Sequence, residues 1–175
     1  MTKNVFITGG SGQDGQILIN ILKKKKINLT VISKTKKLKT SSNVSFVKEN
    51  LLDKKKLDVL FKKKKPDIVL HLAANNPSYS ENSYKIFFED NYKATNNLFN
   101  STFQANQKAK FIFCSSSQIF KKKIGKVDEK SEKILTFIIF FKKTTSFFMI
   151  DFIILGNKNF RFLNIESWLN KIALV

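Results

Sequence analysis

A glycine-rich segment near the N-terminus is the first group of residues whose spacing could bind a ligand. Residues 8–15 read Thr-Gly-Gly-Ser-Gly-Gln-Asp-Gly and lie between a short apolar run and a segment with helical spacing. In this context Gly9 permits a tight turn, Gly12 lets the backbone approach a pyrophosphate, and Gly15 allows close packing of helix on strand. The N–H groups at the helix N-terminus then face the phosphates. The segment predicts a dinucleotide site, and an ordinary structural turn is the alternative.

The end of the second apolar run bears on which dinucleotide is bound. Proteins that hold the ribose 2′-hydroxyl of NAD usually have an acidic residue there, whereas this chain has Ser33-Lys34-Thr35-Lys36-Lys37. Because a 2′-phosphate attracts lysine, we expect NADP rather than NAD, with Lys34 at the 2′-phosphate. The alternative is that these lysines belong to the general lysine excess of the chain.

Two further apolar runs end in small or hydroxyl-bearing residues. Ala73 and Ala74 follow the fourth run and are small enough for a cofactor to lie against the backbone. Serines at 115–117 follow the fifth run, where ligands gather in open α/β sheets, so their hydroxyls could orient a substrate oxygen. A polar loop that caps a helix is the alternative. We expect His71 to be a packed or hydrogen-bonded residue and Cys114 to be an inert core thiol.

The elements that position these residues follow from the apolar pattern. Short apolar runs, expected as strands, alternate with segments of helical spacing over the first 120 residues. The strands are expected at 5–7, 29–32, 44–47, 67–70 and 111–113, and the helices at 16–22, from Asp53 to Pro66, and at 83–105. Near-continuous apolar strands that alternate with helices predict an α/β fold with a doubly wound, Rossmann-like parallel sheet of five or six strands.

Composition limits the other classes of function. With 175 residues, one cysteine and one histidine, the chain is one ordinary domain in which we expect neither a disulfide nor a metal site. The net charge of +19 comes almost entirely from lysine, with Arg161 as the only arginine. Because base and phosphate recognition favours arginine, we expect no specific nucleic-acid partner and attribute most of the lysine to AT-rich codons. A salt-sensitive binder of anionic surfaces ranks last among the hypotheses.

Two sequence features bear on location. The N-terminus has no signal-peptide pattern. The longest apolar stretch, residues 134–155, is interrupted by Lys142, Lys143 and Asp151, so we expect no membrane span. The expected compartment is the cytoplasm.

Taken together, these motifs resemble the extended short-chain dehydrogenase/reductase family of NAD(P)-dependent epimerases and dehydratases. The glycine loop matches the family pattern Thr-Gly-x-x-Gly-x-x-Gly, and its second half is similar to the loop of GDP-mannose 4,6-dehydratases. Segments 50–53 and 71–74 and Asn91 also resemble family motifs, and the resemblance runs from residue 3 to about 132. It implies cofactor binding by Gly9, Ser11, Gly12, Gln13, Asp14, Gly15, Lys34, Asn50, Leu51, Ala73 and Ala74.

The resemblance also implies a reaction. In GDP-mannose 4,6-dehydratases, NADP takes a hydride from sugar C4, water is eliminated across C5–C6, and the hydride returns to C6. By alignment Ser116 orients the C4 oxygen and Lys143 holds the nicotinamide ribose. Gln118 stands where these enzymes have a glutamate, and Ile139 stands where the tyrosine of Tyr-x-x-x-Lys belongs. Both departures remove an acid–base group that the family reaction uses.

Aligning Lys142 instead of Lys143 places Ile138 at the tyrosine position, with the same consequence. We expect residues 1–133 to form the NADP-binding domain and residues 134–175 to be a degenerate remainder of the active-site helix and the following strand, with the substrate domain largely missing. A frameshift near residue 133 is the alternative to a diverged helix.

The expected function is that of a GDP-mannose 4,6-dehydratase with impaired activity. The alternatives are a non-catalytic dinucleotide-binding remnant or sensor, and another nucleotide-sugar epimerase or reductase of the same family. Family members often pair through the helices that follow the fourth and fifth strands, so the resemblance implies a homodimer.

Overall fold

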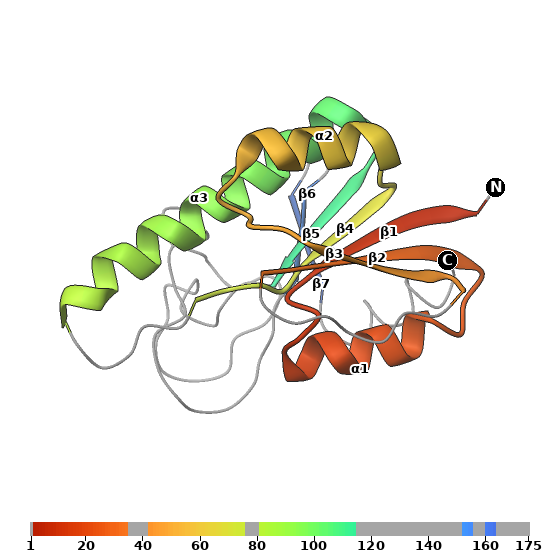
Figure 1. The fold of residues 1–175 in the computed structure, drawn as a ribbon, viewed down its shortest axis with the longest axis horizontal. Helices are drawn as coiled ribbons and strands as arrows, with labels where there is room; N and C mark the ends of the chain where they lie inside the picture. Colours follow the sequence, from red (N-terminus) through yellow and green to blue (C-terminus); the bar gives the residue numbers. More distant parts are fainter. Residues whose placement is uncertain (1, 35–41, 76–80, 115–151, 156–159, 164–175) are drawn as a thin grey trace.

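Five parallel strands form the centre of the fold (Figure 1). A computed structural model describes residues 2–34, 42–75, 81–114, 152–155 and 160–163. Along the chain the elements are β1 (Lys3–Thr8), α1 (Gln13–Leu22), β2 (Ile27–Ser33), β3 (Val44–Lys48), α2 (Lys54–Lys64), β4 (Ile68–His71), α3 (Glu81–Ala105), β5 (Lys110–Cys114), β6 (Phe152–Leu155) and β7 (Phe160–Leu163). All eight elements expected over the first 120 residues are present, with bounds that differ by at most three residues.

The strand order is β3-β2-β1-β4-β5-β6-β7, and every pairing among β1 to β5 is parallel. The chain first runs outward from β1 to β3 and then returns to place β4 on the other side of β1. This reversal makes the carboxyl ends of β1 and β4 the switch point at which open α/β sheets bind ligands. The predicted doubly wound α/β fold is confirmed.

Helices cover both faces of the sheet, with α1 on one side and α2 and α3 on the other (Figure 1). Successive residues of β1 point to opposite faces, as the period of a strand requires. Val5 and Ile7 pack in one apolar cluster with Leu18 of α1. Phe6 packs in the other cluster with Phe61 of α2, at a ring-centroid distance of 4.9 Å. The core therefore lies in two layers separated by the sheet.

Helix α2 shows why the chain begins and ends a helix where the sequence predicts. The Asp53 carboxylate accepts a hydrogen bond of 3.2 Å from the Lys56 N–H and so caps the first turn. This backbone hydrogen bond, together with the charge of Lys56, lowers the pKa of Asp53 although partial burial acts against it. At the other end, lysines fill the last turn, Lys65 takes a left-handed conformation with φ of 42°, and Pro66 follows.

The edge beyond β5 differs from the prediction of five or six parallel strands. β6 pairs antiparallel with β5, and β7 pairs antiparallel with β6. Residues 134–175 were expected to hold a remainder of the active-site helix and a following strand, and the part of this segment that the structure describes consists of the two strands β6 and β7. A run of Phe, Ile and Leu has no period of its own, and its aromatic and β-branched residues favour a strand. The proposed domain boundary at residue 133 lies outside the described residues.

Among the helices that the structure describes, none is both long and apolar enough to cross a bilayer.

Candidate cofactor site

Gly9 joins β1 to the glycine loop and lies against the end of β4. Its φ of 75° is in the left-handed region that favours glycine. A Cβ atom built on Gly9 would lie 2.7 Å from the backbone nitrogen of Ala73 and 2.9 Å from the carbonyl carbon of Leu72. The predicted tight turn is therefore present, and the glycine is also required by the close approach of two backbone segments.

Two other glycines are required by packing within and against the loop. A Cβ atom on Gly15 would overlap the carbonyl oxygen of Gly9 and lie 2.6 Å from the Gly10 Cα. At Gly15 itself, α1 thus contacts the loop that follows β1, whereas the packing of α1 on the strand is made further along the helix by Leu18. A Cβ atom on Gly10 would overlap the side chain of Val31 in β2. Sequence reasoning missed this role of Gly10, for which the Gly-Gly pair was the available signal.

Gly12 differs from the other three glycines. It is exposed, and its φ of −76° and ψ of 167° can be adopted by any residue. A Cβ atom there would meet only the Gly9 carbonyl oxygen, at 3.3 Å. Gly12 is also the N-cap of α1 and supplies no side-chain cap to the first-turn N–H groups. Backbone donors and an exposed position without a side chain therefore coincide at Gly12, which fits the approach of a phosphate.

The end of β2 provides hydroxyl and basic groups next to the loop. The Ser33 hydroxyl is buried and donates a long hydrogen bond of 3.5 Å to the Ser11 hydroxyl. Lys34 follows and is exposed. The Glu49 N–H donates to the Ser33 carbonyl at 3.1 Å, which ties the end of β3 to the end of β2. Thr35, Lys36 and Lys37 lie outside the described residues.

A chain of neutral hydrogen bonds lies beneath the loop and defines the tautomer of His71. The Thr95 hydroxyl donates to the Asn91 carbonyl at 2.8 Å, so it accepts at 3.0 Å from Nε2–H of His71. Nδ1 of His71 then accepts from the Thr8 hydroxyl at 2.7 Å. The Thr8 oxygen in turn accepts from the Ala73 N–H at 3.3 Å. Each donor in this chain of hydrogen bonds has one acceptor. Together the hydrogen bonds join β1, β4 and α3.

His71 is therefore a structural residue, as the sequence analysis expected. Its side chain is 1% exposed, and burial lowers its pKa to about 3. A neutral imidazole both donates and accepts, which is what its two threonine partners require. Cys114 ends β5 and is half-buried beside the apolar cluster of β1, so it is less enclosed than the predicted core thiol.

The segment after β4 is held at its far end by α3. The Asn91 side chain accepts from the Asn75 N–H at 2.7 Å and donates to the Asn75 carbonyl at 2.9 Å. Ala73 and Ala74 lie between these two hydrogen bonds and the contact of the chain with Gly9. Ala73 is half-buried, and Ala74 is exposed. Small side chains thus lie on a fixed backbone at the switch point of the sheet.

The loop after β3 reaches the same edge of the sheet. Asn50 is exposed, and its side-chain oxygen accepts from the Leu52 N–H at 3.1 Å. The Asp53 N–H donates to the Asn50 carbonyl at 3.0 Å. Leu51 is half-buried and packs against the cluster that contains Phe6. The predicted adenine-side residues therefore lie in an ordered turn at the carboxyl end of a strand.

The structure brings together eleven predicted residues at one edge of the sheet, and leaves the others undescribed. The loop residues, Lys34, Asn50, Leu51, Ala73 and Ala74 all follow the carboxyl ends of β1, β2, β3 or β4. The predicted catalytic residues Ser116, Gln118 and Lys143, and Ile139 at the tyrosine position, lie outside the described residues. What the described residues offer is binding chemistry: backbone donors, exposed lysines at the ends of β2 and β3, and small side chains.

Known proteins with similar sequences share this part of the chain. A dTDP-D-glucose 4,6-dehydratase of Dictyostelium discoideum is 34% identical over 133 residues, which cover 67% of this chain and 30% of that protein. A decarboxylating sterol-4-alpha-carboxylate 3-dehydrogenase of the same organism is 33% identical over 115 residues, which cover 64% of this chain and 34% of that protein. The matched region thus spans about a third of the length of these relatives.

Solved structures agree with the fold. The Bordetella bronchiseptica enzyme WbmG, solved in complex with NAD, superposes with a TM-score of 0.65 at 20% sequence identity, over 77% of this chain and 44% of that one. The model of the NAD dependent epimerase/dehydratase family matches residues 5–137, which contain most of β1, the glycine loop and β2 to β5. The chain therefore belongs to the NAD-dependent epimerase/dehydratase family.

Proposed function

We propose that the carboxyl edge of β1 to β4 binds NADP, and that the chain serves a nucleotide-sugar 4,6-dehydratase reaction. The observation that carries the cofactor proposal is Gly12. Its absent side chain meets only one protein atom, while the neighbouring glycines are all required by protein packing. A glycine that packing does not require, beside uncapped helix N–H groups, is what a bound pyrophosphate needs.

Each part of the cofactor has a candidate partner at this edge. The loop from Gly9 to Gly15 binds the pyrophosphate, Lys34 attracts the 2′-phosphate, the turn at Asn50 and Leu51 borders adenine, and Ala73 and Ala74 line the remaining length. A nicotinamide bound there would supply reversible hydride transfer. In this proposal Ser116 orients the sugar oxygen, and Lys143 holds the nicotinamide ribose.

Calorimetric titration of two glycine variants tests the site. Gly12→Ala places a methyl group where the pyrophosphate lies in this proposal, so we expect NADP⁺ affinity to fall at least about tenfold, while the melting temperature falls less than in Gly15→Ala. Gly15→Ala forces α1 away from the loop, so we expect it to lower the melting temperature. Wild-type affinity in folded Gly12→Ala would contradict the cofactor site.

The choice of NADP over NAD is tested separately. We expect the wild-type chain to bind NADP⁺ more tightly than NAD⁺, and Lys34→Glu to remove that preference because a carboxylate repels the 2′-phosphate. Lys26→Glu is the matched control, since it makes the same charge change at the exposed opposite end of β2. Equal wild-type affinities for the two cofactors would refute the preference and leave the site intact.

The substrate is proposed to be a nucleoside-diphosphate sugar. The resemblance of residues 12–15 to the GDP-mannose dehydratase loop favours GDP-mannose, and the 34% identical relative favours dTDP-glucose as a second candidate. Incubation with each sugar nucleotide and NADP⁺, followed by detection of a 4-keto-6-deoxy sugar, separates them. Product from neither, despite saturable cofactor binding, would favour the non-catalytic dinucleotide-binding alternative, which Ile139 at the tyrosine position supports.

A further inference from the structure

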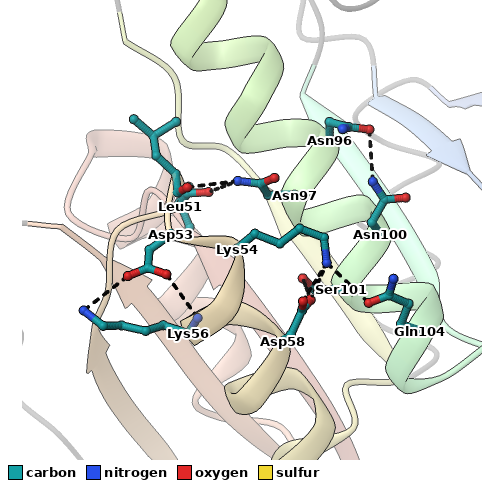
Figure 2. A network of polar contacts seen from close by, with 11 residues as sticks. Leu51, Asp53, Lys54, Lys56, Asp58, Asn96, Asn97, Asn100, Ser101 and Gln104 are labelled. Atoms are coloured by element: carbon teal, nitrogen blue, oxygen red, sulfur yellow. Dashed lines mark hydrogen bonds and ion pairs between the residues drawn. The ribbon is translucent and has the colours of Figure 1, made fainter.

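Asn97 is a buried amide that contacts a loop rather than a neighbouring helix. It lies on α3 and is 6% exposed. Its side-chain nitrogen donates to the carbonyl oxygen of Leu51 at 3.0 Å and to that of Leu52 at 3.3 Å (Figure 2). Both acceptors belong to the turn between β3 and α2, about 45 residues earlier in the chain.

The polar residues around Asn97 have other partners. One turn further along α3, the Ser101 hydroxyl donates to Asp58 of α2 at 2.6 Å. Asn100 donates to Asn96 on the same helix at 3.2 Å. Among these three side chains on α3, Asn97 is the one whose hydrogen bonds end on the turn at residues 50–52 (Figure 2).

The chemistry of the contact calls for an amide. Two backbone carbonyls that converge on one buried point need two N–H donors from one side chain, and a carboxamide supplies both without a charge. A carboxylate there would repel both oxygens, and an apolar residue would leave two carbonyls without these donors. Leaving half-buried carbonyls without these donors has a cost, so the contact restrains the path of the turn.

We propose that Asn97 is a positioning residue for the adenine end of the cofactor site; this inference rests on the proposed NADP site. The hydrogen bonds of Asn97 to the carbonyls of Leu51 and Leu52 fix the position of the turn relative to α3. They thereby fix the position of Asn50 and Leu51 at the adenine end of the proposed site. The turn is then ordered before the cofactor arrives, and no ordering cost is subtracted from its affinity. Asn97 acts through the turn and has no contact with the ligand in this proposal.

Binding of cofactor fragments to matched variants tests the proposal. In Asn97→Ala we expect NADP⁺ and 2′,5′-ADP, which carry adenosine, to bind about tenfold more weakly, while nicotinamide mononucleotide binds as to wild type. Asn100→Ala makes the same chemical change on the same helix away from the turn, and should bind all three as wild type does. Equal affinity of the two variants for 2′,5′-ADP would overturn the proposal.

Two further measurements separate the ways in which the test could fail. Amide hydrogen exchange at Leu52 and Asp53 reports the order of the turn without any ligand. We expect faster exchange in Asn97→Ala and unchanged exchange in Ser101→Ala, which weakens only the contact with α2. Wild-type exchange rates in Asn97→Ala would overturn the role of Asn97 even with the site intact.

If the wild-type chain binds no adenosine-containing probe, the cofactor site fails and the inference fails with it. Asn97→Ser covers the case in which Asn97→Ala does not fold, because serine retains one donor. We expect an affinity for 2′,5′-ADP between those of wild type and alanine, about threefold below wild type, and full wild-type affinity would count against the proposal.

Discussion

Helix α3 takes part in two polar networks that differ in charge and burial. The His71 network consists of Thr8, His71, Thr95 and Asn91; its partners are neutral, and His71 is fully buried. The Asp58 network consists of Lys54, Asp58, Ser101 and Gln104, and joins α2 to α3 (Figure 2). In it the Lys54 ammonium lies 2.6 Å from the Asp58 carboxylate, and Asp58 is 38% exposed.

The difference follows from the cost of removing polar groups from water. A charge buried beneath the loop would need a counter-charge with excellent geometry, so the interior position is occupied by a neutral ring with both nitrogens bonded. At the half-exposed helix interface water still solvates the ions, so the ion pair is tolerated but contributes little. The two networks should therefore respond to different perturbations.

Acid should act first, and most strongly, on the His71 network. Burial lowers the folded-state pKa of His71 to about 3, against an ordinary value of 6.5, so below pH 6.5 the unfolded chain binds a proton that the folded chain excludes. Stability is therefore fully present above pH 6.5 and is lost as pH falls towards 3. We expect a loss of about 2 kcal/mol between pH 7 and pH 5. Urea unfolding at half-unit pH intervals measures it.

His71 is the only histidine of the chain, so no other imidazole contributes to this loss. In His71→Asn the amide retains a donor and an acceptor but does not titrate, and the slope between pH 7 and pH 5 should disappear. A wild-type slope near zero in this range would mean that the ring is accessible to protons in the folded state.

Thr95→Val should have the next largest effect on stability, because it leaves the buried Nε2–H of His71 without its acceptor. We expect a loss of about 1.5 kcal/mol in the free energy of unfolding at pH 7. Thr102→Val is the control on the same helix: Thr102 is buried, whereas Thr95 is half-buried, and the Thr102 hydroxyl donates to the Leu98 carbonyl one turn earlier. Equal losses for the two variants would show that the link between His71 and α3 adds nothing beyond a local helix contact.

The His71 network also shows what the sequence could and could not predict. The strand that ends at His71 and the helix that carries Thr95 were both predicted, because their apolar periodicity is local. His71 was predicted to be a packed or hydrogen-bonded residue, and it is buried with both ring nitrogens bonded. Its partners were not, because Thr8 and Thr95 are 63 and 24 residues away and no local pattern encodes that register.

In the glycine loop, too, some features could be predicted from the local sequence and others could not. Local spacing was enough to predict the turn at Gly9. The contact of Gly9 with Ala73, and that of Gly10 with Val31, depend on strand order and could not be read from the loop. Likewise, the apolar run at Phe152–Leu155 does not specify its partner, so the antiparallel pairing with β5 was missed.

Asp58→Asn should have a smaller effect than either change in the His71 network. The exposed fraction of Asp58 keeps the ion pair weak, so we expect a loss below about 1 kcal/mol at pH 7. Burial alone would raise the pKa of Asp58, but hydrogen bonds from Lys54 and Ser101 outweigh it and lower that pKa below 3.8. This contribution is therefore present above pH 3.8 and lost only as pH falls below it. Unfolding curves of both proteins at pH 7 and pH 5 should differ by the same amount.

Salt should produce the smallest effect, and it separates the networks by charge alone. At 1 M NaCl the screening length falls to about 3 Å, so the stability difference between wild type and Asp58→Asn should shrink by a few tenths of a kcal/mol. The difference between wild type and Thr95→Val should stay constant, because no ion takes part in the hydrogen bond that it removes. Urea unfolding of the three proteins at 0.1 M and 1 M NaCl gives both differences, and general salt effects cancel in them. If the Thr95→Val difference shrank as much as that of Asp58→Asn, the His71 network would have to contain a charged imidazole, and its fixed neutral tautomer would be wrong.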